Sequence, residues 1–270
     1  GRMTLRNAFA QSINSIAIQL SETVGRQRVI NMAQKLGITS EINPDPSIAL
    51  GTSEVTLLDM TTAYAHLAAN GSSVLPYAIR KVETSDGRVI FEKQTVSSGE
   101  VLSQPIVKMM NNMMLAVTTI GTGRGAQFGR PVAGKTGTTS DYRDAWFIGF
   151  TPELVTGVWV GNDDTSTMKK VSGGALPASI WRSYMSEALK GTPVAQIPNQ
   201  SDNAGSGILP WLFNDVVKPL DSIPANPVNN LNQPIAPQKP VNEPMPEEEP
   251  TPEYNVPPSF WENLLGNGKK

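Results

Sequence analysis

The feature that most constrains the fold is an abrupt change of composition near residue 191. Fifteen of the 22 prolines lie between Pro193 and Pro258, and proline neither continues a helix nor donates in a sheet. A segment this rich in Pro, Asn and Glu cannot bury enough apolar surface to offset its ordering entropy. We therefore expect one folded domain over residues 1–191 and a Pro/Asn/Glu-rich, disordered tail over residues 192–270.

Composition excludes several kinds of chemistry. The chain has no cysteine and a single histidine, His66, so disulfides, thiol nucleophiles, Cys-ligated zinc and His-rich metal sites are ruled out. We expect no metal and no cofactor, and we expect His66 to be packed rather than part of a triad. Residues 1–190 carry 18 basic and 15 acidic side chains without a basic cluster, which argues against a nucleic-acid partner. No apolar run approaches the ~18 residues of a membrane span.

Apolar residues at helical spacing predict five helices in the first 191 residues. The predicted ranges are 5–20, 26–36, 53–69, 103–117 and 177–190. Thr4 and Ser53 are the expected N-caps of the first and third. The stripe expected to be buried in the last helix is Ile180, Trp181, Tyr184, Met185 and Leu189. The methionines of the fourth helix are expected to fill the core rather than to bind a ligand.

Alternating patterns predict five strands. Residues 77–84 and 88–94 flank Ser85-Asp86-Gly87, which is typical of a hairpin turn. The three further strands are expected at residues 133–139, 145–151 and 154–161. These last strands carry apolar residues on both faces, which indicates a sheet covered by helices on each side. The expected fold class is therefore an α/β (α+β) sandwich.

Residues 129–136 match the P-loop pattern G-x-x-x-x-G-K-[ST] letter for letter. A P-loop needs a buried strand before its glycines and a helix after the Lys-Thr to receive phosphate. Here a Gly-rich loop precedes the match, and a turn and a strand follow it. We therefore reject a nucleotide-binding role.

The same residues make sense as the edge of a strand. Lys135 beside the hydroxyls of Thr136 and Thr138 would bind a carboxylate, and backbone N–H groups there could polarise a carbonyl. Gly137, which has no side chain, would allow a substrate close to the backbone. An acyl-transfer site also needs a nucleophile and a base. Lys acting with Ser is the combination that this composition leaves.

Several blocks in this order resemble class A penicillin-binding proteins, whose signature set includes S-x-x-K, S-x-N and K-T-G. The matching blocks are Ala10-Gln11-Ser12-Ile13-Asn14-Ser15, residues 49–56 (ALGTSEVT), Gly121-Thr122-Gly123, residues 133–139 (AGKTGTT), residues 144–147 (DAWF) and residues 161–164 (GNDD). The resemblance implies a largely antiparallel penicillin-binding protein/β-lactamase-like fold. It also implies a peptidoglycan D,D-transpeptidase, which cross-links the cell wall and is a target of β-lactam antibiotics.

The resemblance assigns roles to individual residues. Ser12 would relay protons between Lys135 and the lysine of the nucleophile motif, and Asn14 would hydrogen-bond the substrate's amide carbonyl. Thr136 and Thr138 would bind the terminal carboxylate of a D-Ala-D-Ala stem peptide or of a penicillin. The Thr138 amide would supply half of the oxyanion hole. Read alone, Ser12 and Asn14 could instead end one helix and cap the next.

One motif of the family departs from its expected place. The S-x-x-K nucleophile should precede S-x-N by several tens of residues, yet the only such string is Ser166-Thr-Met-Lys169, in an expected loop. We interpret that string as coincidental. The resemblance implies that the nucleophile, a membrane anchor and any glycosyltransferase domain lie in an upstream part of the same protein, and that the domain works at the outer face of the cytoplasmic membrane. The isolated fragment should be inactive and poorly stable.

Two rival functions share much of this pattern. A non-catalytic sensor module would bind penicillin or peptidoglycan reversibly without acylation. A penicillin hydrolase would turn the drug over rather than retain an adduct.

Overall fold

The computed structural model describes residues 3–94 and 99–199, so the expected tail lies outside the described residues from residue 200 onward. The helices are α1 (Leu5–Ala10), α2 (Asn14–Val24), α3 (Arg26–Lys35), α4 (Leu57–Ala68), α5 (Gln104–Thr119) and α6 (Leu176–Ala188). Short 3-10 turns are η1 (Pro46–Leu50), η2 (Arg124–Ala126) and η3 (Ser140–Tyr142). The strands are β1 (Lys81–Glu83), β2 (Val89–Glu92), β3 (Ala133–Thr138), β4 (Asp144–Phe150) and β5 (Val155–Gly161).

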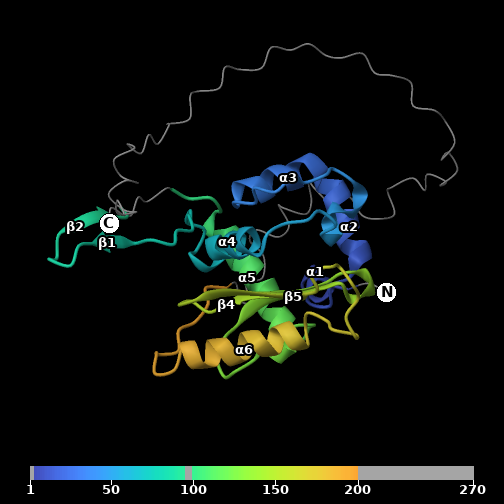
Figure 1. Cartoon of the computed structure of the whole chain (residues 1–270). Coiled ribbons are helices and arrows are strands. Elements are labelled where there is room, and N and C mark those ends of the chain that lie inside the picture. Colours follow the sequence, from blue (N-terminus) through green and yellow to red (C-terminus); the bar gives the residue numbers. More distant parts are fainter. Residues whose placement is uncertain (1–2, 95–98, 200–270) are drawn as a thin grey trace, which may run out of the picture. The chain divides into compact units, whose positions relative to one another are not determined.

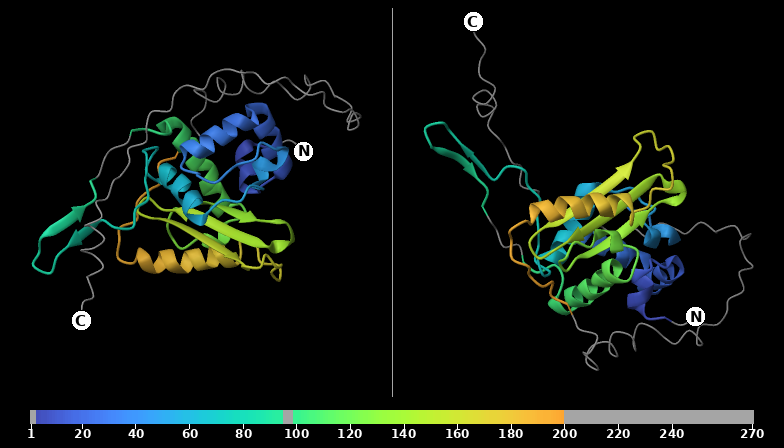
Figure 2. Two further views of the ribbon diagram at one scale, coloured as in Figure 1. Left: turned by 45° about the horizontal axis from the view of Figure 1, so that its top comes forward. Right: turned by 90° about the horizontal axis from the view of Figure 1, so that it is seen from below.

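A three-stranded antiparallel sheet in the order β3-β4-β5 forms the centre of the fold. Helix α6 lies on one face, and α4 and α5 lie on the other (Figures 1 and 2). The turn between β4 and β5 is closed by the Thr151 amide, which donates to the Leu154 carbonyl at 3.0 Å. The predicted sandwich and its three strands are confirmed, with strand ends within a residue of those expected.

Successive side chains of β4 point to opposite faces of the sheet and pack into two separate hydrophobic cores. Phe150 packs with Leu67 of α4 and Met114 of α5 on one face. Phe147 packs with Trp181 of α6 on the other face. The two rings meet edge to face with centroids 5.2 Å apart, and Trp181 Nε1 donates to the Thr156 carbonyl at 2.9 Å. Met114 is buried as expected of core filler. Each side of the sheet therefore has its own apolar layer.

Part of the predicted stripe on α6 is wrong. Trp181, Met185 and Leu189 are buried, but Ile180 is 43% exposed and Tyr184 is 55% exposed. A helix lying on a sheet buries one narrow side. The apolar residues of α6 cover a wider arc than that side, so adjacent positions remain in solvent.

Two helix boundaries also differ from the predictions. The single helix expected over residues 5–20 is two helices, α1 and α2, with a break between Ala10 and Asn14. Thr4 caps α1 as predicted. The cap of α4 is Thr56 rather than Ser53, because the Thr56 hydroxyl accepts the Asp59 amide at 3.0 Å.

The predicted hairpin is confirmed, although its strands are shorter than expected. Strands β1 and β2 pair antiparallel, and Gly87 takes a left-handed φ of 86° in the turn. The hairpin stands away from the helices and sheet (Figure 2), and β2 is exposed along its length.

The packed chain continues beyond Gly191. Ile197 is buried in the same core as Phe150, and Asn111 Nδ2 donates to the Pro198 carbonyl at 2.8 Å. Within residues 3–94 and 99–199, no helix has the length and apolarity needed to cross a membrane.

Trp181→Ala should lower the free energy of unfolding by about 3–5 kcal/mol, because it leaves a cavity between Phe147 and α6 and removes the bond to Thr156. The matched control is Ile180→Ala on the exposed side of the same helix, which should change stability by only about 0.5 kcal/mol. Urea unfolding of both variants measures the difference. Equal losses would contradict the assignment of the buried side of α6.

Candidate active site

The break between α1 and α2 places a serine beside the sheet. Ser12 adopts a left-handed φ of 54°. This backbone conformation costs a non-glycine residue about 1–3 kcal/mol of conformational free energy. The end of α1 is held by two contacts with the chain after α5: Gln11 Nε2 donates to the Ile120 carbonyl at 3.0 Å, and the Thr122 amide donates to the Ala10 carbonyl at 3.1 Å. These contacts fix the turn in which Ser12 lies.

Lys135 of the edge strand β3 reaches this serine. Its Nζ donates to Ser12 Oγ at 2.8 Å and to the Thr136 carbonyl at 3.0 Å, and it lies 5.8 Å from the centroid of the Phe9 ring. Burial lowers the pKa of the Lys135 ammonium from 10.5 to about 8, because a charged group loses its hydration there. An amine with this pKa can exchange a proton with a bonded hydroxyl near neutral pH.

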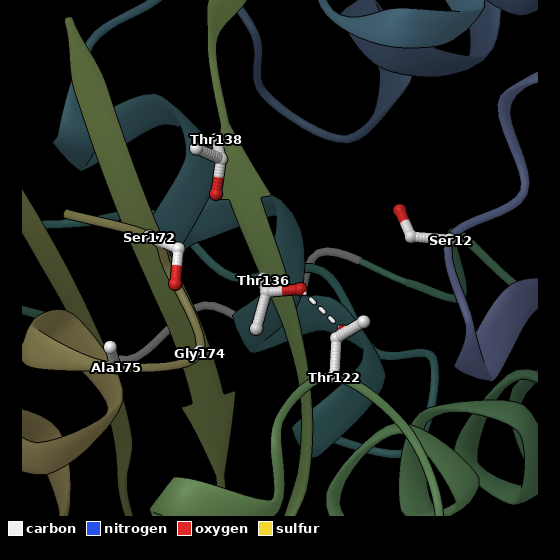
Figure 3. A pocket seen from close by; sticks show the side chains of 7 residues that line it. All are labelled: Ser12, Thr122, Thr136, Thr138, Ser172, Gly174 and Ala175. Carbon is white, nitrogen blue, oxygen red and sulfur yellow. Dashed lines mark hydrogen bonds between the residues drawn. The ribbon is translucent and has the colours of Figure 1, made fainter. Parts of the chain in front are cut away.

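A pocket of about 480 Å³ opens between the α1–α2 turn and β3 (Figure 3). It is lined by Ser12, Thr122, Thr136, Thr138, Ser172, Gly174 and Ala175. The lining carries five hydroxyls and no acidic group. The Lys135 amine is bonded to Ser12, which lines the pocket. The pocket is therefore suited to an anion such as a carboxylate.

The structure brings together most of the predicted site residues. Ser12, Thr136 and Thr138 line one pocket, and Lys135 is bonded to Ser12. Gly137 lies between the two threonines, opposite Trp146 of β4. Asn14 is the first residue of α2 and is exposed, but it does not line the pocket.

Sequence reasoning gave no role to Thr122, Ser172 or Gly174, which also line this pocket. The signal for Thr122 was its place in the family-like block Gly121-Thr122-Gly123, to which no role had been assigned. A second weak signal is the Gly173-Gly174 pair, which follows Ser172. Neither signal identifies a partner.

The structure also bears on two motif matches. Residues 133–136 of the P-loop-like string lie in strand β3, which is followed by the short turn η3 and by β4, so the string lacks the loop-to-helix context of a P-loop. Ser166 lies in an exposed loop, where its Oγ accepts from Asn162 Nδ2 at 3.0 Å. Among the described residues, no group of three or more His, Cys, Asp or Glu could hold a metal ion.

The chain has an antiparallel sheet with helices on both faces. A lysine on its edge strand is bonded to a serine between two helices. This is the arrangement expected of the penicillin-binding protein/β-lactamase-like fold. Residues 1–186 match the family model described as the penicillin binding protein transpeptidase domain. The chain belongs to this family, and the predicted resemblance is confirmed.

Individual relatives agree with the family match. Penicillin-binding protein 1A of Aquifex aeolicus is 43% identical over 187 residues, which are 68% of this chain and 26% of that protein. Its counterpart in Neisseria lactamica is 38% identical over 201 residues, covering 72% of this chain and 25% of that protein. The chain thus spans about a quarter of the length of these curated relatives.

Solved structures show the same fold. The penicillin-binding protein PonA1 of Mycobacterium tuberculosis superposes with a TM-score of 0.67 at 29% identity, covering 74% of this chain and 60% of that one. Penicillin-binding protein 1A of Haemophilus influenzae gives a TM-score of 0.64 at 28% identity, covering 72% and 35%.

Lys135 should make stability depend on pH. Its folded pKa of about 8 lies below the ordinary 10.5, so between these values the unfolded chain binds more protons and the free energy of unfolding rises with pH. Lys135→Met should remove this rise, whereas Lys108→Met, at an exposed position of α5, should retain it. Urea unfolding from pH 7.5 to 10.5 measures the slopes. Parallel curves for the wild type and Lys135→Met would refute the shift.

Proposed function

We propose that this chain forms the C-terminal part of a serine D,D-transpeptidase domain, which cross-links peptidoglycan stem peptides through an acyl-enzyme. The observation that carries the proposal is the 2.8 Å bond from Lys135 Nζ to Ser12 Oγ beside the hydroxyl-lined pocket. Family membership supports an acyl-transfer reaction. The expected boundary at residue 191 moves, because Ile197 is buried in the core with Phe150: residues 1–199 would constitute this portion of the domain, and the expected tail would begin after them.

The proposed reaction begins with binding of the donor stem. Thr136 and Thr138 hold the carboxylate of the terminal D-Ala, and the Asn14 amide hydrogen-bonds the substrate's amide carbonyl. The Thr138 amide contributes to the oxyanion hole, and the close approach is possible because Gly137 presents no side chain. The five hydroxyls around the pocket and the absence of an acidic lining residue support an anionic ligand.

The chemical step transfers the peptide to a serine that lies outside the printed residues. That serine's Oγ attacks the carbonyl of the penultimate D-Ala, and the C–N bond to the terminal D-Ala breaks. Ser12 and Lys135 relay the serine's proton to the leaving amine. An amine of a second stem then attacks the ester, which forms the cross-link and returns the proton to the serine. The lowered pKa of Lys135 supports its part in this relay.

β-Lactams are the proposed inhibitors, and the site is proposed to face the outside of the cytoplasmic membrane. PonA1 of Mycobacterium tuberculosis, solved in complex with penicillin V, superposes with a TM-score of 0.65 at 30% identity. A membrane anchor would lie in a segment outside the printed residues. A sensor module that binds penicillin without acylation is the second candidate, because the one S-x-x-K string lies in an exposed loop.

Incubation of this 270-residue chain with benzylpenicillin should leave its intact mass unchanged, because the proposed nucleophile is not among these residues. Circular dichroism confirms that the protein is folded during the measurement. A covalent adduct would refute the placement of the nucleophile, and peptide mapping would then distinguish Ser12 from Ser166.

In a protein extended to the length of its relatives, Lys135→Ala should slow acylation by benzylpenicillin by about 10²–10⁴-fold, because it removes the proton relay and the positive charge. The matched control, Lys169→Ala, alters the coincidental S-x-x-K string and should leave the rate unchanged. Stopped-flow measurement with a fluorescent penicillin gives both rates. Normal acylation by Lys135→Ala would refute the transpeptidase assignment, and reversible binding without acylation in the extended wild type would favour the sensor.

A further inference from the structure

The two pocket-facing hydroxyls of β3 each have a partner from another segment. Thr136 Oγ1 lies 2.6 Å from Thr122 Oγ1 (Figure 3), which belongs to the loop after α5. Thr138 Oγ1 accepts the Gly173 amide at 3.0 Å, from the loop before α6. Thr122 lies in the family-like block Gly121-Thr122-Gly123, to which the sequence analysis gave no role in the site, and Gly173 lies outside the matching blocks. Both therefore act on the pocket from outside the Lys-Thr-Gly strand.

These partners determine where the threonine protons can point. A hydroxyl has one proton to donate and two lone pairs that accept. Because a Thr138 lone pair takes the Gly173 N–H, the Thr138 proton is free to donate into the pocket. The Thr136 proton is likewise free to donate into the pocket only if Thr122 is the donor of the 2.6 Å bond. The direction of that one bond therefore decides whether the pocket offers two donors or one.

The backbone of Thr122 is held from both sides. Its amide donates to the Ala10 carbonyl at 3.1 Å, two residues before Ser12. A Cβ on Gly121 would overlap the Ala10 carbonyl oxygen, and a Cβ on Gly174 would overlap the Thr122 carbonyl oxygen. Only glycine permits these approaches without a shift of the backbone. The backbone of Thr122 is thus fixed relative to both the serine turn and the loop before α6.

We propose that Thr122 is a positioning residue that makes the pocket specific for a carboxylate anion. Thr122 donates to Thr136, as Gly173 donates to Thr138, so that both strand hydroxyls direct their protons toward the ligand. Two donors of this kind suit a carboxylate, which only accepts, better than a neutral carboxamide. This inference rests on the proposed function, in which Thr136 and Thr138 bind the stem-peptide carboxylate.

The opposite bond direction makes the opposite prediction. If Thr136 donated to Thr122, its proton would be unavailable to the ligand. Removal of the Thr122 hydroxyl would then release that proton and strengthen carboxylate binding. The sign of the change in affinity therefore reports the direction of the bond.

The test compares N-acetyl-D-alanyl-D-alanine with its C-terminal carboxamide, with Kd measured by NMR titration of the full chain. Thr122→Val should weaken binding of the carboxylate about tenfold, because the Thr136 hydroxyl is no longer oriented to donate its hydrogen bond to the charged ligand, and should change carboxamide binding by less than about twofold. Thr122→Ser should retain the wild-type ratio. The matched control is Thr119→Val, since the exposed Thr119 hydroxyl donates only within α5, to Leu115.

Each outcome decides a separate point. An unchanged or increased ratio of carboxylate to carboxamide affinity in Thr122→Val would overturn the inference and leave the proposed function standing. A wild-type chain without preference for the carboxylate would contradict the proposed function itself. Thermal unfolding checks the fold of each variant. Should Thr122→Val impair folding, Thr122→Ala, which adds no atom to the site, decides by the same ratio.

Discussion

The geometry of the site depends on two hydrogen bonds that join the end of α1 to the chain after α5. The Thr122 amide donates to the Ala10 carbonyl, and Gln11 donates to the Ile120 carbonyl. These contacts stop α1 short and place Ser12 within 2.8 Å of Lys135, which lies 123 positions later in the chain. The geometry of the Lys-Ser pair thus follows from helix packing rather than from local sequence.

The Ser12–Lys135 pair brings two energetically unfavourable features together in the site. Ser12 has a left-handed backbone, and the Lys135 ammonium is partly desolvated. Strain of this kind persists only where the surrounding structure over-determines it. Here the two hydrogen bonds at the end of α1 and the packing of Phe9 on the core that contains Phe150 and Met114 supply that surrounding structure.

The sequence predicted the sheet better than it predicted the site. Period-2 alternation located β3, β4 and β5 within a residue, because both faces of the sheet are buried and the pattern is strong. The single helix over residues 5–20 was predicted because Phe9, Ile13 and Ile16 keep helical spacing across the break. The alternative interpretation, that one helix ends near Ser12 and another begins near Asn14, is the one the structure shows. The Thr122–Thr136 pair could not be predicted either. It joins two hydroxyls through tertiary packing, and neither local propensity nor hydrophobic periodicity records such a contact.

Burial explains how a chain with a single histidine can present a base. His66 is buried in α4, where its Nδ1 lies 2.8 Å from the Thr62 carbonyl of the same helix, and it does not line the pocket. A solvated lysine would remain charged near neutral pH and could not accept a proton. Desolvation at the edge of β3 lowers the pKa of Lys135 to about 8, so that a fraction of the amines is neutral near neutral pH and can accept a proton. Because this pKa still lies above neutral pH, most of the Lys135 amines remain charged, so that in the proposed reaction one group can both relay a proton and attract a carboxylate.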